Sequence, residues 1–453
     1  MNRKAIALIT ALVIASVSST VFAADNLANR LGLKFSGGGT FILAGTPELN
    51  VTKNDNNGEN NASYSLDLSI TKEFENNGKI VARFEGGAGK GIAREELTTY
   101  ATVNADADET IYTSTSASYV QIKLTQLFYQ QSFLDNKFTI NFGKLNLGSY
   151  FAKNQYAGDG TTQFITKSFA ADELIEKPGQ VIAIRLNYAM TDKLDVDYAY
   201  FATQLNHFDS KGINILQAAY KPCKKGNYRV YIWTSNKDYY SFKNLENKSG
   251  TYGVGLSADQ EINEKIGVFA RFGYKNPSVV SASGAPASGS ASILIASGTT
   301  INIPAVLSAS DTVSASLIAN STIPAVVNVS STITIPAVAI ASGSINDYEA
   351  YEAIKHTLSL SWSIGVQLKD FCSLRTNDVI GFALGQMYGS DEYKKYNPGV
   401  KNKAETQLEL YYKLVLNEYI AVTPAVQYFV NSLGGNTNKD NIIIYGIRTQ
   451  FSF

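Results

Sequence analysis

The side chains in this sequence that could do chemistry are charged or hydrogen-bonding groups that recur at every second position inside apolar stretches. Successive side chains of a strand point to opposite faces, so groups spaced by two residues share one face. Such a face can exchange hydrogen bonds with polar solutes. Opposite charges are interspersed, so we expect no strong selectivity between cations and anions. The members are Arg83, Glu85, Lys123, Asn141, Arg185, Asp195, Asp197, Arg229, Tyr231, Trp233, Arg271, Glu405, Glu409 and Arg448. Arg83, Arg185 and Arg271 are the first candidates for a constriction.

Catalytic and metal-binding patterns are not evident. His207 falls in an expected loop and His356 on an apolar face, and neither belongs to a zinc motif or to Cys/His ligand spacing. A nucleophile elbow in a strand-to-helix setting is also missing. Acidic residues are abundant, but a glycosidase pair cannot be chosen from one sequence. We therefore expect no enzyme activity, no metal and no cofactor, and the balance of 39 basic and 39 acidic residues does not indicate nucleic acid.

The two cysteines, Cys223 and Cys372, fall in expected short turns. These turns lie several strand pairs apart, and neighbouring strands are about 4.8 Å apart, whereas a disulfide requires Cα atoms within about 7 Å. We expect two unpaired thiols.

Alternation of apolar and polar residues predicts the elements that position these groups. In residues 181–202, Ile184, Leu186 and Tyr188 alternate with Arg185 and Asn187 and the pattern then returns as a hairpin. Comparable hairpins surround the sequences ENNG, LDNK, KPCKKGN, EINEK, DFCSLRTND and NE. From a first strand at about 31–44 to the last at 441–453, the count is about sixteen strands, each near the length that a tilted strand needs to cross a bilayer.

The last strand shows why the apolar face should meet lipid. Ile443, Tyr445, Ile447, Phe451 and Phe453 share one face, while the opposite face becomes polar toward its end. Lipid offers no hydrogen-bond partner, so strands span it only in a closed ring. The fold class expected is an all-β, transmembrane antiparallel β-barrel of about sixteen strands, with short periplasmic turns, long extracellular loops and a wet interior. The alternative from the residues is a secreted β-sandwich or repeat protein.

The first 23 residues predict export. A basic start precedes a short apolar run, and small residues follow at an expected cleavage site near Ala23. The division expected is a signal peptide at 1–23 and an outer-membrane barrel at 24–453. A terminal Phe453 at the periplasmic lipid interface resembles the signal that outer-membrane assembly machinery reads.

Residues 277–345 break the alternation. They hold half of the chain's ten prolines and a single charged residue, Asp311. Recurrent prolines argue against spanning strands here. We expect a low-complexity extracellular loop insert, with an ordered cap that narrows the channel as the alternative.

The stretch 124–201 resembles the carbohydrate-selective porin family, OprB. The resemblance is carried by FYQQSFLDNKFTINFGKLNL, NQYAGDGTTQF and PGQVIAIRLNY, and the end of the chain is similar as well. It implies an outer-membrane porin that passes small neutral sugars, with the loop after GKLNL folded inward and Asp159 and Gln163 at the constriction. The family usually has an acidic pair where this loop reads Gly158-Asp159-Gly160, and the insert is not typical of it.

Three other functions remain open at this point. They are a general, non-selective porin, a surface adhesin that displays 277–345, and an outer-membrane barrel enzyme. The partners expected are outer-membrane lipid, small neutral sugars and the assembly machinery, with no nucleic acid, and the chain is expected to be a monomer or a homotrimer.

Overall fold

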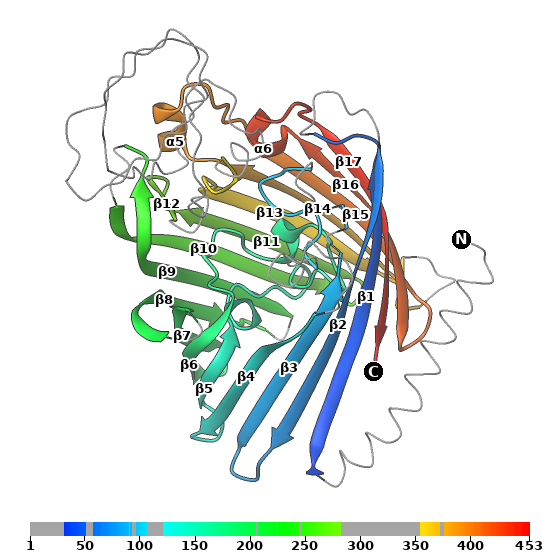
Figure 1. The fold of residues 1–453 in the computed structure, drawn as a ribbon. Coiled ribbons are helices and arrows are strands. Elements are labelled where there is room, and N and C mark those ends of the chain that lie inside the picture. Colours follow the sequence, from blue (N-terminus) through cyan, green and yellow to red (C-terminus); the bar gives the residue numbers. More distant parts are fainter. Residues whose placement is uncertain are drawn as a thin grey trace.

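The computed structural model shows a single β-barrel with polypeptide inside it (Figure 1). It describes residues 31–50, 58–89, 91–92, 97–106, 121–204, 207–223, 225–243, 247–281, 354–371 and 376–453. The expected signal peptide, most of the 277–345 insert and Cys372 lie outside the described residues. Cys223 has a free, exposed thiol.

The strands occur where the alternating pattern predicts them. Their bounds are β1 Leu33–Thr46, β2 Glu59–Glu73, β3 Gly78–Ala88, β4 Gln121–Phe133, β5 Phe138–Asn146, β6 Gln180–Thr191, β7 Leu194–Gln204, β8 His207–Tyr220, β9 Gly226–Ser241, β10 Asn247–Asn263, β11 Ile266–Lys275, β12 Val279–Ser281, β13 Leu360–Lys369, β14 Val379–Tyr388, β15 Glu405–Val415, β16 Ile420–Val430 and β17 Ile442–Ser452.

Antiparallel pairing closes the sheet into a ring. Each strand pairs with the next along the chain, except that β11 pairs with β13, and β17 pairs with β1. The short β12 pairs with the end of β9 outside the ring. Of the seventeen strands described, sixteen therefore form the barrel, which confirms the predicted fold class. Closure leaves no unpaired strand edge to face lipid.

The two faces of the strands differ in the expected way. In β17, Ile443, Tyr445 and Ile447 are 42%, 48% and 41% exposed, whereas Ile444 and Arg448 on the inner face are 2% and 0% exposed. In the ENNG hairpin, Asn77 takes a positive φ of 60° at the turn between β2 and β3. This positive φ is tolerated by Asn, which favours a tight turn.

A β-bulge changes the alternation within β4. The register between β3 and β4 shifts at Arg83 and Phe84. As a result, Ile122 and Leu127 both face outward, with exposures of 74% and 45%, although they are an odd number of positions apart. An extra residue in one strand exchanges the inward-facing and outward-facing positions beyond it. Counting in strict steps of two would therefore assign the residues of half of this strand to the wrong face.

Two segments fill much of the barrel interior. The β5–β6 connection, residues 147–179, enters the barrel and is called here the inward loop; it contains η1 Leu147–Ser149 and α3 Lys167–Ala170. Part of the β3–β4 connection, residues 97–106, also lies inside and is called here the second segment. The inward loop was expected from the family resemblance, whereas the second segment was not.

Loops at one end of the barrel share an apolar cluster, which we call the mouth cluster. It includes Tyr393 of α5 Asp391–Tyr396 and Leu433 of α6 Ser432–Gly435, at the end opposite the short turns (Figure 1). The helices within the described ranges are all too short or too polar to cross a membrane. The mouth cluster consists of Tyr100, Ala101, Leu174, Phe242, Val280, Ile354, Leu358, Met387, Tyr393 and Leu433. Val280, near the start of the insert, and Ile354, which follows the insert, therefore both belong to this cluster.

Candidate functional site: the channel beside the inward loop

Buried charged side chains hold the inward loop against the wall formed by β9–β17, called here the anchored side. The carboxylate of Glu409 accepts hydrogen bonds from the backbone N–H groups of Ile165 and Thr166, at 2.6 and 2.8 Å. The guanidinium of Arg271 donates to the carbonyl oxygens of Phe169 and Ala157, at 2.9 and 2.7 Å. Buried backbone groups need such partners because water does not reach them, so these charges fix the course of the loop.

Aromatic packing reinforces these anchors. The ring of Phe164 contacts Phe169, Phe269 and Tyr411 with centroid separations of 5.6, 5.6 and 5.0 Å. Phe269 and Tyr411 belong to β11 and β15, so one loop residue bridges two parts of the wall.

A carboxylate also holds the second segment. Glu405 accepts from the N–H of Tyr100 at 3.0 Å and from the N–H of Leu433 at 2.6 Å. The second segment then pairs with the inward loop, through Ala105 N–H to the carbonyl of Ile165 at 2.7 Å. The two segments therefore form one packed body inside the barrel.

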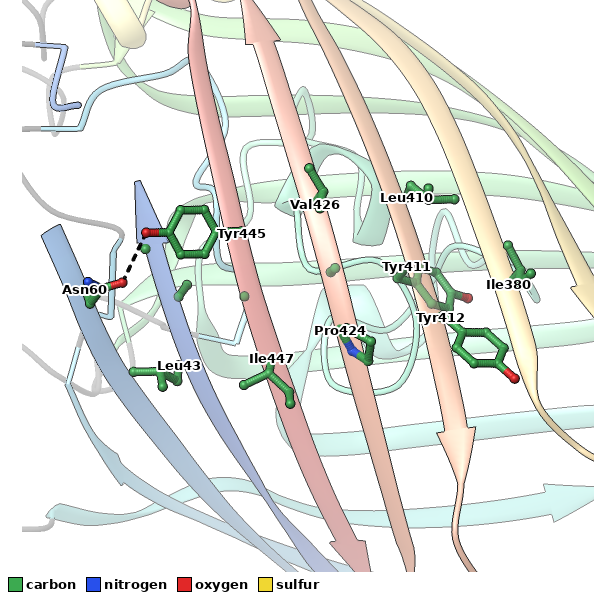
Figure 2. A pocket seen from close by; sticks show the side chains of 14 residues that line it. Leu43, Asn60, Ile380, Leu410, Tyr411, Tyr412, Pro424, Val426, Tyr445 and Ile447 are labelled. Carbon is green, nitrogen blue, oxygen red and sulfur yellow. Dashed lines mark hydrogen bonds between the residues drawn. The ribbon is translucent and has the colours of Figure 1, made fainter. Parts of the chain in front are cut away.

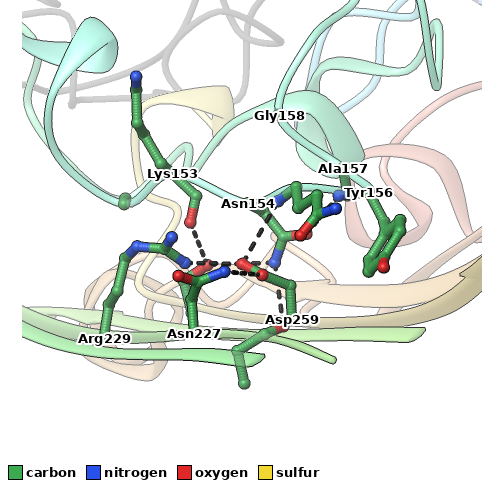
Figure 3. Close-up of polar contacts among 12 residues, drawn as sticks. Lys153, Asn154, Tyr156, Ala157, Gly158, Asn227, Arg229 and Asp259 are labelled. Carbon is green, nitrogen blue, oxygen red and sulfur yellow. Dashed lines mark hydrogen bonds and ion pairs between the residues drawn. The ribbon is translucent and has the colours of Figure 1, made fainter. Parts of the chain in front are cut away.

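The inward loop reaches the anchored side a third time at β9 and β10 (Figure 3). Arg229 forms an ion pair with Asp259 at 2.7 Å, and the N–H of Gln155 donates to Asp259 at 3.3 Å. Ser257 donates its hydroxyl to the carbonyl of Lys153 at 2.8 Å. In Figure 3 the amino group of Lys153 extends away from this wall.

The remaining space is bounded by side chains that we call the open face: Asp67, Arg83, Lys153, Asp159 and Gln163. Asp67 and Arg83 lie on the inner faces of β2 and β3 and are exposed, as is Lys153 of the inward loop. Asp159 accepts from the N–H of Thr161 at 2.8 Å. Since the wall and the inward loop both contribute, the open face is the candidate constriction.

Positive and negative charges are distributed unevenly along the open face. Burial lowers the pKa of Lys153, and the charges of Arg185, Arg83 and Arg229 lower it further. Cations therefore crowd around Lys153.

Carboxylates lie nearby, on the side of the second segment. Burial raises the pKa of Asp106 to about 7, against the hydrogen bond from Ser65, and the charges of Asp67 and Asp159 add to the increase. A solute that passes the open face thus meets positive charge at Lys153 and negative charge at Asp67 and Asp159.

Several predicted residues lie on this inner surface. Arg83 belongs to the open face, and Arg185 is half-buried with its guanidinium 4.6 Å from the ring centroid of Tyr150 while it pairs with Asp197. Glu85 and Lys123 oppose each other on β3 and β4. Asp195 lies near the short-turn end of β7, where it pairs with Lys221 at 2.5 Å.

Other predicted residues face inward but do not reach open space, which corrects their assignment as channel-lining groups. Trp233 and Tyr231 are each 1% exposed because the inward loop covers them in one apolar cluster. Arg271 is 5% exposed and serves as an anchor. Asn141, Asp197, Glu405, Glu409 and Arg448 are also buried, with exposures of 0%, 5%, 0%, 1% and 0%.

Sequence reasoning missed Asp67, Lys153 and Asp106. Asp67 could have been found, because it alternates with Leu66 and Leu68 in β2. Lys153 and Asp106 lie in connections without alternation, and only the tertiary structure shows where they point.

A cavity of about 550 Å³ lies on the outer surface of the barrel and not in the channel (Figure 2). Leu43, Pro424, Val426, Tyr445 and Ile447 line it with outward-facing side chains from β1, β16 and β17. Its apolar lining suits contact with lipid, so it plays no part in solute passage.

Most of this chain matches a known protein family. The model of the carbohydrate-selective porin, OprB family, matches residues 52–289 and 304–453. This chain belongs to that family. The porin lies in the bacterial outer membrane, in agreement with its closed barrel and apolar outer face.

A solved structure shares the fold of this porin at low sequence identity. The high-pH structure of Pseudomonas putida OprB is 14% identical and superposes with a TM-score of 0.67, covering 94% of this chain and 96% of that chain. The outer membrane channel DcaP of Acinetobacter baumannii is 12% identical with a TM-score of 0.49, covering 93% and 97%.

A curated relative matches a short part of the porin. The uncharacterized protein alr4550 of Nostoc sp. is 34% identical over 93 residues, which are 20% of this chain and 15% of that protein. The match thus spans less than a fifth of the relative's length.

Proposed function

We propose that this porin gives passive, carbohydrate-selective diffusion of small sugars along the open face. One observation carries the proposal. Asp67, Arg83 and Lys153 are exposed inside the barrel, next to an inward loop that buried hydrogen bonds hold in a fixed position. Membership of the OprB family supports sugars as the solutes.

Weak, repeated hydrogen bonds would supply the selectivity. A channel must bind a solute well enough to admit it and weakly enough to release it. Charged side chains make stronger hydrogen bonds than neutral ones, and Asp67 and Arg83 present both a charged acceptor and a charged donor to sugar hydroxyls. Aromatic stacking contributes little in this proposal, because Trp233 and Tyr231 are covered.

Liposome swelling with a series of sugars of increasing size tests this function. We expect glucose to enter faster than its size alone allows. Entry rates that follow size alone would instead favour a general diffusion porin, and no sugar entry would favour a barrel that only displays its surface loop.

We also propose that residues 1–23 are a cleaved signal peptide and that Phe453 is read by the assembly machinery. In the structure, the N–H of Phe453 donates a hydrogen bond to the carbonyl oxygen of Gly37 at 2.9 Å, so Phe453 extends the pairing of β17 with β1. The oligomeric state proposed is a monomer or a homotrimer. Cross-linking in intact outer membranes and N-terminal sequencing of the exported chain would test these points.

The 277–345 insert is proposed to be an extracellular loop outside the channel. Val280 near its start and Ile354 beyond its end belong to the mouth cluster, at the end of the barrel away from the short turns. Deletion of 282–345 should leave the unitary conductance unchanged. A change in conductance or gating would favour the alternative of a cap over the channel.

A further inference from the structure

A cavity of about 380 Å³ lies between the outgoing and returning arms of the inward loop. The outgoing arm contributes Lys153 and Gln155, the returning arm Asp172 and Lys177, and the wall Arg229. Because Lys153 and Gln155 are exposed, the cavity communicates with the water along the open face.

The acidic groups at this cavity already have partners within the protein. Asp172 is buried and accepts hydrogen bonds from the hydroxyl of Tyr231 and from the N–H of Leu174 at 2.9 Å. Asp159 accepts from the hydroxyl of Thr162 at 2.6 Å. These carboxylates are therefore committed to holding the loop, and they offer few free lone pairs to a solute.

Two basic groups differ in this respect. Within the described ranges, the amino groups of Lys153 and Lys177 have no ion pair or hydrogen bond. Glu173 and Asp172 act on Lys177 only from a distance, and Glu173 pairs with Lys167 at 3.5 Å. Arg229, in contrast, is paired with Asp259. The amino groups of these two lysines are therefore open to a solute, whereas the cavity's carboxylates already accept hydrogen bonds from neutral groups of the protein.

The surroundings of Lys153 also favour an incoming anion. Burial lowers the pKa of Lys153 most, the charges of Arg185, Arg83 and Arg229 lower it further, and the charge of Asp197 acts in the opposite direction. A partly desolvated cation next to like charges is stabilised by an incoming anion.

We propose that this cavity is a transient binding site for anionic sugar derivatives, meaning monosaccharides that have one carboxylate or phosphate group. Lys153 and Lys177 pair with the anionic group, and Thr162 and the loop backbone exchange hydrogen bonds with the hydroxyls. The inference rests on the proposed sugar channel and extends it to a charged class of solute.

Current block in planar bilayers tests the site with the full-length mature porin. Gluconate supplies the carboxylate, glucose 6-phosphate supplies the phosphate, and glucose serves as the neutral probe. We expect one or both anionic probes to reduce the KCl current at concentrations at which glucose does not. A charge-assisted hydrogen bond contributes about a factor of ten or more to binding, so Lys153→Gln and Lys177→Gln should each raise the half-blocking concentration at least about tenfold.

Matched variants separate the site from general charge effects. Lys153→Arg and Lys177→Arg should restore block because they retain the charge. Lys413→Gln removes the same charge from the inner face of β15, outside this cavity, and should leave block unchanged. The Lys153 side chain is exposed, so its substitution should not impair folding.

The outcomes distinguish this inference from the proposed function. Equal block of wild type and of the Lys153→Gln/Lys177→Gln double variant would overturn the site while leaving the sugar channel intact. Block by glucose at the same concentration as by gluconate would also overturn it. Absence of glucose entry in the swelling assay would instead contradict the proposed function itself.

Discussion

The anchored side and the open face of this barrel contain the same types of side chain, but their environments differ. Arg271 is 5% exposed and donates to two loop carbonyls. Arg83 is exposed on β3 and faces the water inside the barrel. One arginine holds the loop and the other is available to solutes, so inward position alone does not define a channel-lining residue.

Burial explains the difference in physical terms. A buried charge is tolerated only when hydrogen bonds compensate for lost hydration. Glu405 and Glu409 meet this requirement with backbone N–H groups of the inserted segments. Substitutions on the anchored side should therefore move the loop and destabilise the barrel, whereas substitutions on the open face should alter ion and solute preference alone.

The largest effect is expected for Glu409→Ala. The N–H groups of Ile165 and Thr166 would lose their acceptor, at a cost of about 1–3 kcal/mol for each buried group left unpaired. The inward loop should detach and the unitary conductance should increase. Glu75→Ala, at an exposed turn, is the control and should change neither conductance nor thermal stability. A normal conductance and stability for Glu409→Ala would show that the loop does not depend on this anchor.

Trp233→Ala should destabilise the barrel without changing ion selectivity. The side chain is buried beneath the inward loop, and truncation of such a residue costs about 3–5 kcal/mol. Thermal unfolding in detergent measures this loss, and Ile232→Ala on the lipid-facing side of the same strand is the control. If selectivity changed and stability did not, Trp233 would have to line the channel after all.

Asp106 should make the packing of the second segment depend on pH. Its pKa is about 7 in the folded protein, against 3.8 for an ordinary Asp, so the folded state binds the proton more tightly. The contribution of Asp106 to the free energy of unfolding is therefore present at low pH and is lost as the pH rises from about 4 to about 7. Ser65, Asp67, Asp159 and Arg448 are the groups around it.

Unfolding midpoints measured from pH 4 to pH 9 would test this dependence. Asp106→Asn keeps the shape and removes the titration, so its midpoint should decline less across that interval. An identical pH profile for wild type and Asp106→Asn would remove Asp106 as the cause.

The smallest change in structure is expected for Arg83→Ala. The loss of one cation from the open face should shift the reversal potential toward cation preference without affecting the unfolding midpoint. Lys225→Ala, which removes a cation from a short turn where it pairs with Glu261, is the comparison. An unchanged reversal potential would exclude Arg83 from the ion path.

The strands and their outward faces could be predicted from sequence because alternation is a local signal. Ile443, Tyr445 and Ile447 face outward as their spacing indicates, and the hairpin turns fall where short polar sequences interrupt the pattern. The bulge at Arg83 and Phe84 has no comparable signal, and it reverses the parity within β4.

The candidate site was less predictable because it depends on what fills the barrel. The alternation of side chains correctly placed Trp233 and Arg271 on the inner face, but the sequence did not show that the inward loop covers them. Nor did sequence show that residues 97–106 occupy the interior and bring Asp106 beside Asp67. Contacts such as that of Ala105 with Ile165 join distant parts of the chain, and single-sequence patterns do not encode them.

The most direct test of the account is thiol modification of single-channel current. After Cys223 and Cys372 are replaced by Ser, cysteine is introduced at Arg83, Lys153 or Trp233, and a charged, water-soluble thiol reagent is added to the open channel. We expect the current to fall stepwise for the first two variants and to stay constant for the third. Rapid modification at Trp233, with none at Arg83 or Lys153, would contradict the location of the channel.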